Sequence, residues 1–290
     1  MALCDDVRAH CAQIAGSARS VTIDVAALSE LAEAPAATLD PAIHYLEGPR
    51  EAVARYLLTL DAINFGSGWF PILRKRPGCS GYTTVAAMLS DRFRADGPWS
   101  NAELRSLDTG TIAATLGQRA DFELMALYAE ALRALGRWLG ERSTLDVIDA
   151  SPSAEGLATR LASAMRLFDD RGFYKRAQIV PANLALAGVA AFEDLDRLTI
   201  FADNLVPHVL RCDGVLVYEP RLAAHIDAER PLRPGGPQER EIRACAVHAC
   251  ELLSARLGVA PRVLDSWLWN RGQSPRYKAL PRHRCRCVYY

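Results

Sequence analysis

The sequence lacks the features that mark membrane, secreted and nucleic-acid-binding proteins. Its 290 residues contain no apolar run of the ~18 residues that a membrane-spanning helix needs. Asp5 and Asp6 lie near the start and no apolar segment follows them, so no secretory signal is predicted. Lysine and arginine total 34, and so do aspartate and glutamate. This zero net charge argues against a general nucleic-acid binder. We therefore expect a cytoplasmic protein with neither a membrane nor a nucleic acid as partner.

Common metal and nucleotide motifs are also missing. None of the eight cysteines forms a Cys-x-x-Cys pair, and Cys285 and Cys287 have no second pair nearby, so no zinc site is predicted. A chain of this length does not need disulfides, and we expect reduced thiols. The sequence has no phosphate-binding loop, no His-Glu-x-x-His and no Gly-x-Ser-x-Gly. No metal or cofactor is predicted.

Helical periodicity dominates what is present. Half of the residues are hydrophobic, which is enough to bury a sizeable core. Residues 50–62 and 121–140 place apolar side chains on one stripe at helical spacing, with Asp121 as a possible cap and Gly140 as a possible end. Further helices are predicted at 3–16, 24–34, 83–94, 154–168, 175–192, 195–211, 219–228, 238–257 and 261–270.

Strand signals are sparse, and the predicted fold is therefore all-α, mainly helical with few short strands. Only 21–25 and 215–218 resemble strands, and neither has an obvious partner. No long linker separates two halves, so a single compact helical domain over 1–290 is favoured. The turn at 149–153 marks a possible subdomain split near residue 150.

Two segments carry cations and polar residues at helix ends. Residues 60–71 close a predicted helix with polar and aromatic side chains that can wall a pocket. Residues 171–179 place Lys175 and Arg176 at the start of a predicted helix, whose free N–H groups favour an anion.

Two further segments carry an acid in apolar surroundings. Asp203 interrupts the apolar stretch 198–207, and Asp265 interrupts 263–270, which also contains two tryptophans. Buried carboxylates are costly unless they are paired or functional, so both acids are candidates for a site.

These segments, in this order, resemble the queuosine salvage family, the queuosine 5′-phosphate N-glycosylase/hydrolases. The matching blocks are Phe-Tyr-Lys-Arg-Ala-Gln at 173–178, Leu-Thr-Ile-Phe-Ala-Asp at 198–203, the block 239–243, Leu-Asp-x-x-Leu-Trp at 264–269 and the ending 283–290. The resemblance runs from about His44 to the last residue. It implies hydrolysis of queuosine 5′-monophosphate to queuine and ribose 5-phosphate. It also implies a fold similar to that of helix-hairpin-helix DNA glycosylases, and no metal or redox cofactor.

Cleavage of an N-glycosidic bond passes through a cationic sugar that a preorganised carboxylate can stabilise. The resemblance assigns this catalytic carboxylate to Asp265, as nucleophile or as electrostatic stabiliser. The alternative for Asp265 is a helix cap. Queuine is a 7-deazaguanine without a ring N7 to protonate, so the protein must hold the pyrimidine edge of the base or stabilise the sugar more strongly.

The resemblance assigns base binding to Phe201 by stacking and to Asp203 by hydrogen bonding. The alternative is a core phenylalanine and a solvated acid. Residues two apart face different sides of a regular helix, and we expect Pro207 to distort this one enough for both to reach a pocket.

Ser266 and Asn270 are four apart and share a helix face. The family commonly has Tyr and Asp at these positions, so an anionic partner for the amine of the queuine arm is missing here. We expect both residues still to line the pocket, with Trp267 supplying aromatic surface.

His44 matches a family histidine that contacts the ligand, although a lone histidine is more often structural. Lys175 and Arg176 are candidates for the 5′-phosphate, which carries about two charges near neutral pH. The alternative for both is a solvated helix start. Glu241 and Arg243 are expected to pair with these cations or to support the site from behind.

Two rival functions follow from the same pattern. A DNA-repair glycosylase cleaves the same type of bond but needs a basic duplex-binding face, and 210–215 resembles its hairpin only faintly. A non-enzymatic helical scaffold predicts a large exposed apolar patch and no closed pocket. The sequence leaves the oligomeric state open, and likewise the preference among nucleoside, 5′-phosphate and 3′-phosphate.

Overall fold

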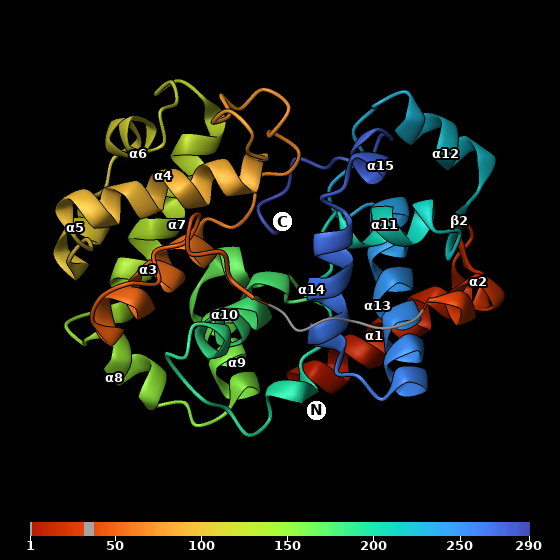
Figure 1. The fold of residues 1–290 in the computed structure, drawn as a ribbon, viewed down its shortest axis with the longest axis horizontal. Coiled ribbons are helices and arrows are strands. Elements are labelled where there is room, and N and C mark those ends of the chain that lie inside the picture. The colour runs from red at the N-terminus through yellow and green to blue at the C-terminus, as the bar shows by residue number, and fades with distance from the viewer. Residues whose placement is uncertain (1, 32–37) are drawn as a thin grey trace.

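Helices build nearly all of the regular structure in the computed structural model, which describes residues 2–31 and 38–290 (Figure 1). The first half contains α1 (Leu3–Ser17), α2 (Val25–Glu30), α3 (Arg50–Ala62), α4 (Gly81–Asp96), α5 (Asn101–Ser106), α6 (Thr109–Thr115), α7 (Glu123–Leu139) and α8 (Thr144–Asp149). The second half contains α9 (Ala154–Ala164), α10 (Lys175–Leu186), α11 (Val206–Cys212), α12 (Pro220–Asp227), α13 (Pro237–Leu257), α14 (Pro261–Arg271) and α15 (Pro275–Lys278). Short 3₁₀ turns lie at Arg166–Phe168 and Leu195–Arg197.

Two short strands join distant parts of the chain. β1 (Val21–Ile23) pairs antiparallel with β2 (Leu216–Tyr218), so each predicted strand is the partner of the other. The prediction of a mainly helical protein with few short strands is confirmed. The similarity to helix-hairpin-helix glycosylases and the single-domain organisation stay predictions.

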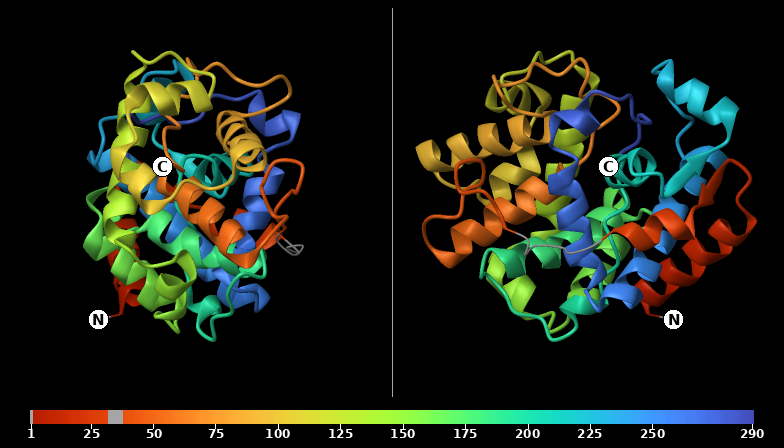
Figure 2. Two further views of the ribbon diagram at one scale, coloured as in Figure 1. Left: turned by 90° about the vertical axis from the view of Figure 1, so that its left-hand side faces the viewer. Right: turned by 45° about the vertical axis from the view of Figure 1, so that its right-hand side comes forward.

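The helices form two groups that are joined at the base. In Figure 1, α3 to α8 lie on one side and α1, α2 and α11 to α15 on the other, while α9 and α10 lie low between them. The right-hand view of Figure 2 shows the same division. The long helix α13 packs along α1, and α10 packs against both α9 and α3. Within the described residues, no helix is long and apolar enough to cross a membrane.

Local sequence sets several helix ends as predicted. Gly140 has a φ of +61° and ends α7, because glycine enters this left-handed region without a Cβ clash. Pro261 begins α14, where its missing N–H costs nothing. The prediction that Asp121 caps α7 is wrong, because Asp121 pairs with Arg119 instead.

The predicted helix at 195–211 is wrong over its central part. After the 3₁₀ turn the chain is irregular from 198 to 205, and α11 begins only at Val206. The backbone N–H of Phe201 donates to Asp265 (2.8 Å), and the carbonyl of Ala202 accepts from Arg243 (3.0 Å). These contacts take hydrogen-bonding groups that a helix would have used. On this irregular path, Phe201 and Asp203 do not have to lie on different helix faces.

Smaller differences concern lengths and short helices. The predicted helices 154–168 and 175–192 end earlier, at Ala164 and Leu186. Part of the predicted helix 24–34 lies outside the described residues, and α2 ends at Glu30. The short helices α5, α6, α8 and α15 were not predicted, because four to seven residues carry too little periodicity.

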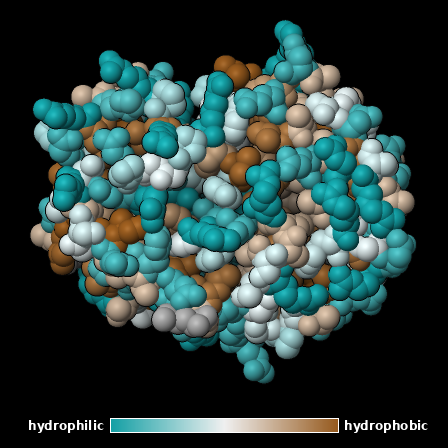
Figure 3. Space-filling view, turned by 180° about the vertical axis from the view of Figure 1, so that it is seen from behind, coloured by the Kyte–Doolittle hydropathy of each residue, from teal (hydrophilic) through white to brown (hydrophobic). Residues whose placement is uncertain are grey.

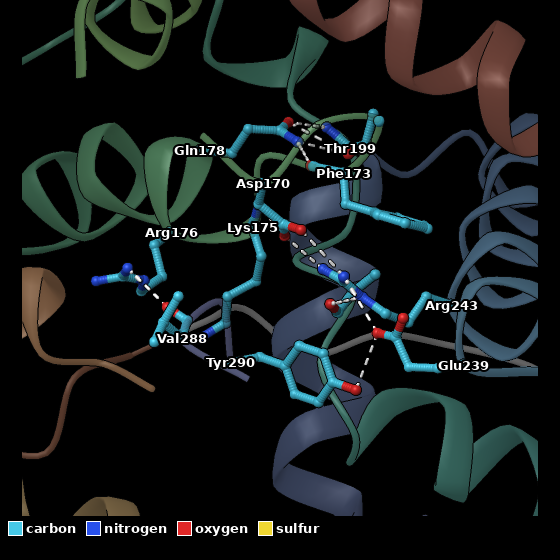
Figure 4. A network of polar contacts seen from close by, with 12 residues as sticks. Asp170, Phe173, Lys175, Arg176, Gln178, Thr199, Glu239, Arg243, Val288 and Tyr290 are labelled. Atoms are coloured by element: carbon cyan, nitrogen blue, oxygen red, sulfur yellow. Dashed lines mark hydrogen bonds and ion pairs between the residues drawn. The ribbon is translucent and has the colours of Figure 1, made fainter. Parts of the chain in front are cut away.

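The buried guanidinium of Arg243 contacts two acids, two aromatic rings and one backbone carbonyl (Figure 4). It forms an ion pair with Asp170 (2.5 Å) and one with Glu239 (3.4 Å). The ring of Phe173 lies 3.9 Å from its central carbon and that of Tyr290 lies 4.7 Å away. Because it also donates to the carbonyl of Ala202, this one side chain joins α13 to three segments that are distant in sequence.

Replacing Asp170 with alanine tests this buried ion pair. Asp170→Ala is expected to lower the free energy of unfolding by about 3 kcal/mol, because it leaves part of a buried charge uncompensated. Urea unfolding followed by circular dichroism measures the loss. Asp91→Ala, which removes an exposed partner of Arg76, is the matched control and should change little. Equal, small effects of both substitutions would contradict a central role for Arg243.

Candidate active site

A cavity of about 520 Å³ lies among segments from distant parts of the chain. Its wall is formed by the loop that follows α3, by the inner face of α10, by the irregular segment 201–205, by α14 and by the tail from 277 onward. The tail is held against the loop that follows α3, because the N–H of Gly66 donates to the carbonyl oxygen of Tyr290 (2.9 Å). Gly68 allows this approach, since a Cβ there would lie 2.3 Å from the carbonyl oxygen of Cys285.

Helix α14 presents one face to the cavity. Its lining residues recur three and four positions apart, as one helix face requires, and they are Arg262, Asp265, Ser266, Trp269 and Asn270. Trp267 is not brought to the cavity, because it lies on another face beside Arg271. Trp269 supplies the aromatic surface that was predicted for Trp267.

Asp265 is buried on this face and keeps one oxygen available. Its Oδ1 accepts a hydrogen bond from the N–H of Phe201 (2.8 Å). Its Oδ2 has no hydrogen-bond partner among the described residues. Burial raises the pKa of Asp265 to about 7 and the charge of Asp203 adds to the rise, while the Phe201 N–H and Lys175 oppose it. Asp265 lies in the second turn of α14, so the helix-cap alternative is excluded.

Phe201 and Asp203 both line the cavity from the irregular segment. The Oδ1 of Asp203 accepts from the N–H groups of Leu205 (2.7 Å) and Val206 (3.1 Å), which fixes the carboxylate at the start of α11. Like Asp265, Asp203 therefore has one oxygen held by the backbone. Its Oδ2 has no hydrogen-bond partner in the described part of the chain.

Lys175 projects into the cavity from the first position of α10. Tyr174, just before it, has a φ of +49°, a strained conformation for a residue with a large side chain. The ammonium is buried and donates to the carbonyl oxygen and to Oδ1 of Asn64, each at 3.2 Å. Burial lowers the pKa of Lys175, and the charges of Asp203 and Asp61 oppose this change.

Arg176 does not reach the cavity, so its predicted role at a phosphate is wrong. Its guanidinium lies between the rings of Phe65 and Phe168 and donates to the carbonyls of Ala62 and Val288. Figure 4 shows it beside Val288 of the tail. Side chains at neighbouring helix positions point in different directions. Lys175 therefore enters the cavity, whereas Arg176 holds the tail through the carbonyl of Val288.

His44 forms one corner of the cavity with two aromatic residues. Its Nδ1 lies 3.0 Å from the carbonyl oxygen of Asp40, so this nitrogen carries the proton. The Nε2 then accepts from the hydroxyl of Tyr82 (3.0 Å). Burial lowers the pKa of His44, which keeps the ring neutral. The ring of Tyr82 stands edge-on to that of Trp269, and both rings line the cavity with Asn270.

The lysines of this chain gather at the cavity, which sequence reasoning missed. Of the 34 cationic residues only three are lysines, namely Lys75, Lys175 and Lys278, and all three line the cavity. Lys75 and Lys278 are exposed. Arg282 also lines it and forms no hydrogen bond or ion pair with a described residue. The scarcity of lysine was the signal that could have drawn attention to these positions.

Glu241 and Arg243 were predicted to support the site, and only Arg243 contacts a segment that lines the cavity. Arg243 holds the segment that carries Phe201 and Asp203, whereas Glu241 accepts from the N–H groups of Arg19 and Ser20 on the other side of α13. Over residues 2–31 and 38–290, no group of three or more His, Cys, Asp or Glu side chains is placed to hold a metal ion.

Comparison with known proteins points to one family. The family described as queuosine salvage protein matches residues 43–290. The chain is 33% identical to a protein of Sphaerobacter thermophilus named queuosine 5′-phosphate N-glycosylase/hydrolase, over 96% of this chain and 95% of that protein. Proteins with the same name from Mus musculus and Dictyostelium discoideum are each 35% identical over 41% of this chain and 40% of their own length.

The raised pKa of Asp265 predicts that this carboxylate destabilises the fold. The folded protein holds a proton on Asp265 up to about pH 7, whereas the unfolded chain releases it near pH 4. Stability is therefore lost as the pH rises through this window. Asp265→Asn should raise the free energy of unfolding at pH 8 by about 2 kcal/mol, with a gain that disappears near pH 4. Urea unfolding at pH 8 and near pH 4 measures this gain. An equal loss of stability at both pH values would contradict the raised pKa of Asp265.

Proposed function

The chain belongs to the queuosine salvage protein family, and we propose that it hydrolyses the N-glycosidic bond of queuosine 5′-monophosphate, releasing queuine and ribose 5-phosphate. The observation that carries this proposal is the cavity in which Asp265 keeps one carboxylate oxygen free. A cavity of about 520 Å³ is within the range of sites that bind small molecules.

Asp265 is the proposed catalytic residue. As the bond between C1′ and the base breaks, positive charge develops on the ribose, and an adjacent carboxylate stabilises it. The Phe201 N–H fixes Oδ1, so Oδ2 is already oriented before the substrate arrives. Water supplies the new hydroxyl at C1′, and the base leaves with the bonding electrons and takes up the proton that the water releases. Because the ionised form of Asp265 is required, activity should fall at acidic pH.

The proposed base site is next to this carboxylate. The Phe201 backbone that donates to Asp265 also carries a ring that lines the cavity, so a stacked base would lie close to Asp265. The free oxygen of Asp203 can accept from the N–H groups of a guanine-like edge. The backbone hydrogen bonds at both carboxylates set the distance between base and sugar sites.

The cyclopentenediol arm of the base is assigned to the corner formed by His44, Tyr82, Trp269 and Asn270. Ser266 also lines the cavity, but its hydroxyl proton is donated to the carbonyl of Arg262 (3.3 Å). This corner offers a side-chain amide, the oxygen of the Tyr82 hydroxyl and two aromatic rings, while both nitrogens of the neutral imidazole are already hydrogen-bonded. In this chain, neutral hydrogen bonds and ring faces therefore take the place of the anionic partner that the family commonly has.

The 5′-phosphate is assigned to the cationic part of the cavity. Lys175 has used two of its three N–H donors on Asn64, which leaves one for an anion. Arg282 and the exposed Lys75 and Lys278 add positive charge around the same space. A phosphate with about two negative charges matches this arrangement better than a neutral nucleoside does. We also assign a cytoplasmic location, which the eight free cysteines support.

The two rival functions receive less support. A binding scaffold predicts a large apolar patch, but on the face seen in Figure 3 the hydrophobic areas are small and interrupted by hydrophilic side chains. A DNA glycosylase needs a basic face for a duplex, whereas the net charge here is zero and all three lysines line the cavity.

Incubation with queuosine 5′-monophosphate tests the proposal, with free queuine read by mass spectrometry. Queuine should be released faster from the monophosphate than from the nucleoside queuosine, and guanosine monophosphate should remain intact. Asp265→Asn should lower kcat about a thousandfold, because the anion that stabilises the sugar cation is removed while the shape is kept.

The control is Asp227→Asn, which removes an exposed carboxylate on α12 that pairs with Arg211 outside the cavity. This variant should retain the activity of the unmodified protein. Retained turnover in Asp265→Asn would contradict the role of Asp265, and no release of queuine from any substrate would contradict the proposed function as a whole.

A further inference from the structure

A further buried carboxylate lies behind the cavity, on α3. Asp61 is fully buried, and it is not among the residues that line the cavity. It accepts hydrogen bonds from Nδ2 of Asn183 (3.0 and 3.1 Å) and from Nδ2 of Asn64 (3.3 Å). No cation lies within ion-pair distance of it among the described residues. A buried carboxylate held only by two amides is costly, so the fold keeps it at the expense of stability.

The two amides that hold Asp61 face the cavity. Asn64 and Asn183 both line it, and the oxygens of Asn64 accept from the ammonium of Lys175. The amide of Asn64 therefore has one orientation: its NH₂ group points to Asp61 and its oxygen points to Lys175. The Asp61 carboxylate therefore determines that the amide oxygen of Asn64, and not its NH₂ group, faces the Lys175 ammonium.

We infer that Asp61 is a positioning residue, which acts through Asn64 to hold the Lys175 ammonium charged and directed into the cavity. This inference rests on the proposed function only for what Lys175 binds. The chemical class of that ligand is an anionic group such as a phosphate monoester. Without Asp61, the Asn64 amide can turn over and present its NH₂ group to the ammonium, which would repel it.

Other charged groups near Lys175 also affect its pKa. Asp203 lies on the segment before α11, Asp265 on α14, and Arg176 is its neighbour on α10. The pKa of Asp61 is raised to about 6 by burial, so Asp61 is mostly ionised above pH 7. Burial, and after it the charge of Asp61, raises the pKa of the nearby Tyr82 hydroxyl, so this tyrosine stays neutral.

Because the chain has only three lysines, NMR can read Lys175 directly. Protein with ¹³C-labelled lysine gives three ε-carbon signals, and Lys175→Arg identifies the buried one. In Asp61→Asn the pKa of Lys175 should fall by about one unit, because a nearby negative charge is lost. Lys75 and Lys278 serve as internal controls and should not change. An unchanged pKa of Lys175 would overturn the inference, whether or not the protein turns over any substrate.

A kinetic cycle separates positioning from a general structural role. Asp61→Asn should raise KM for queuosine 5′-monophosphate about tenfold at pH 9 and shift the alkaline limb of kcat/KM to lower pH. In a Lys175→Met background, the same substitution should have less than about a twofold effect, because the residue through which it acts is gone. Equal losses in both backgrounds would show that Asp61 only supports the fold.

Two further variants keep the test decisive. Asn64→Ala removes the link while Asp61 stays bonded to Asn183, and it too should lower the pKa of Lys175. If Asp61→Asn does not fold, Asn64→Ala is the test. An unchanged pKa of Lys175 in Asn64→Ala would then overturn the inference. Asp194→Asn, which removes a carboxylate that caps α9 outside the cavity, should leave both the pKa of Lys175 and the kinetic profile unchanged.

Discussion

The buried guanidinium of Arg243 is the contact on which the site depends. Its ion pair with Asp170 fixes the strained turn that starts α10 and so places Lys175. Its hydrogen bond to the carbonyl of Ala202 fixes the segment between Phe201 and Asp203. The ring of Tyr290 covers it and is held by Glu239, which anchors the end of the tail (Figure 4). One rigid side chain therefore sets the relative positions of three walls of the cavity.

Several buried charges around this cavity oppose folding. Burial raises the pKa values of Asp265 and Asp61 and lowers that of Lys175, so each of these groups is less stable in its charged form than it would be in water. A protein that needed only a stable core would have apolar residues here. Their presence in one place, each with a polar atom oriented by a neighbour, supports the proposed reaction site. The proposed hydrolysis uses Asp265 and Lys175, and the inferred role of Asp61 is to act on Lys175 through Asn64.

Local sequence was sufficient for most helices but not for the site segment. The apolar stripe of α7 and the glycine and proline at the start of α13 act within a few residues, so both helices could be predicted. The irregular path at 198–205 depends on Arg243 and Asp265, which lie far along the chain. Asp265, Asp203 and Phe201 were found through the family blocks. The link from Asp61 to Lys175 was not, because Asp61 and Asn183 are 122 positions apart and no pattern joins them.

The central claim is that C1′ of a queuosine nucleotide lies beside Asp265, with the base toward Asp203 and the phosphate toward Lys175. A crystal structure of the inactive Asp265→Asn variant with queuosine 5′-monophosphate tests it most directly. We expect the base against Phe201, the C1′ atom next to the side chain of residue 265, and the phosphate within hydrogen-bond distance of the Lys175 ammonium. A nucleotide bound outside the cavity, or bound in it with the phosphate at the His44 corner, would contradict the account.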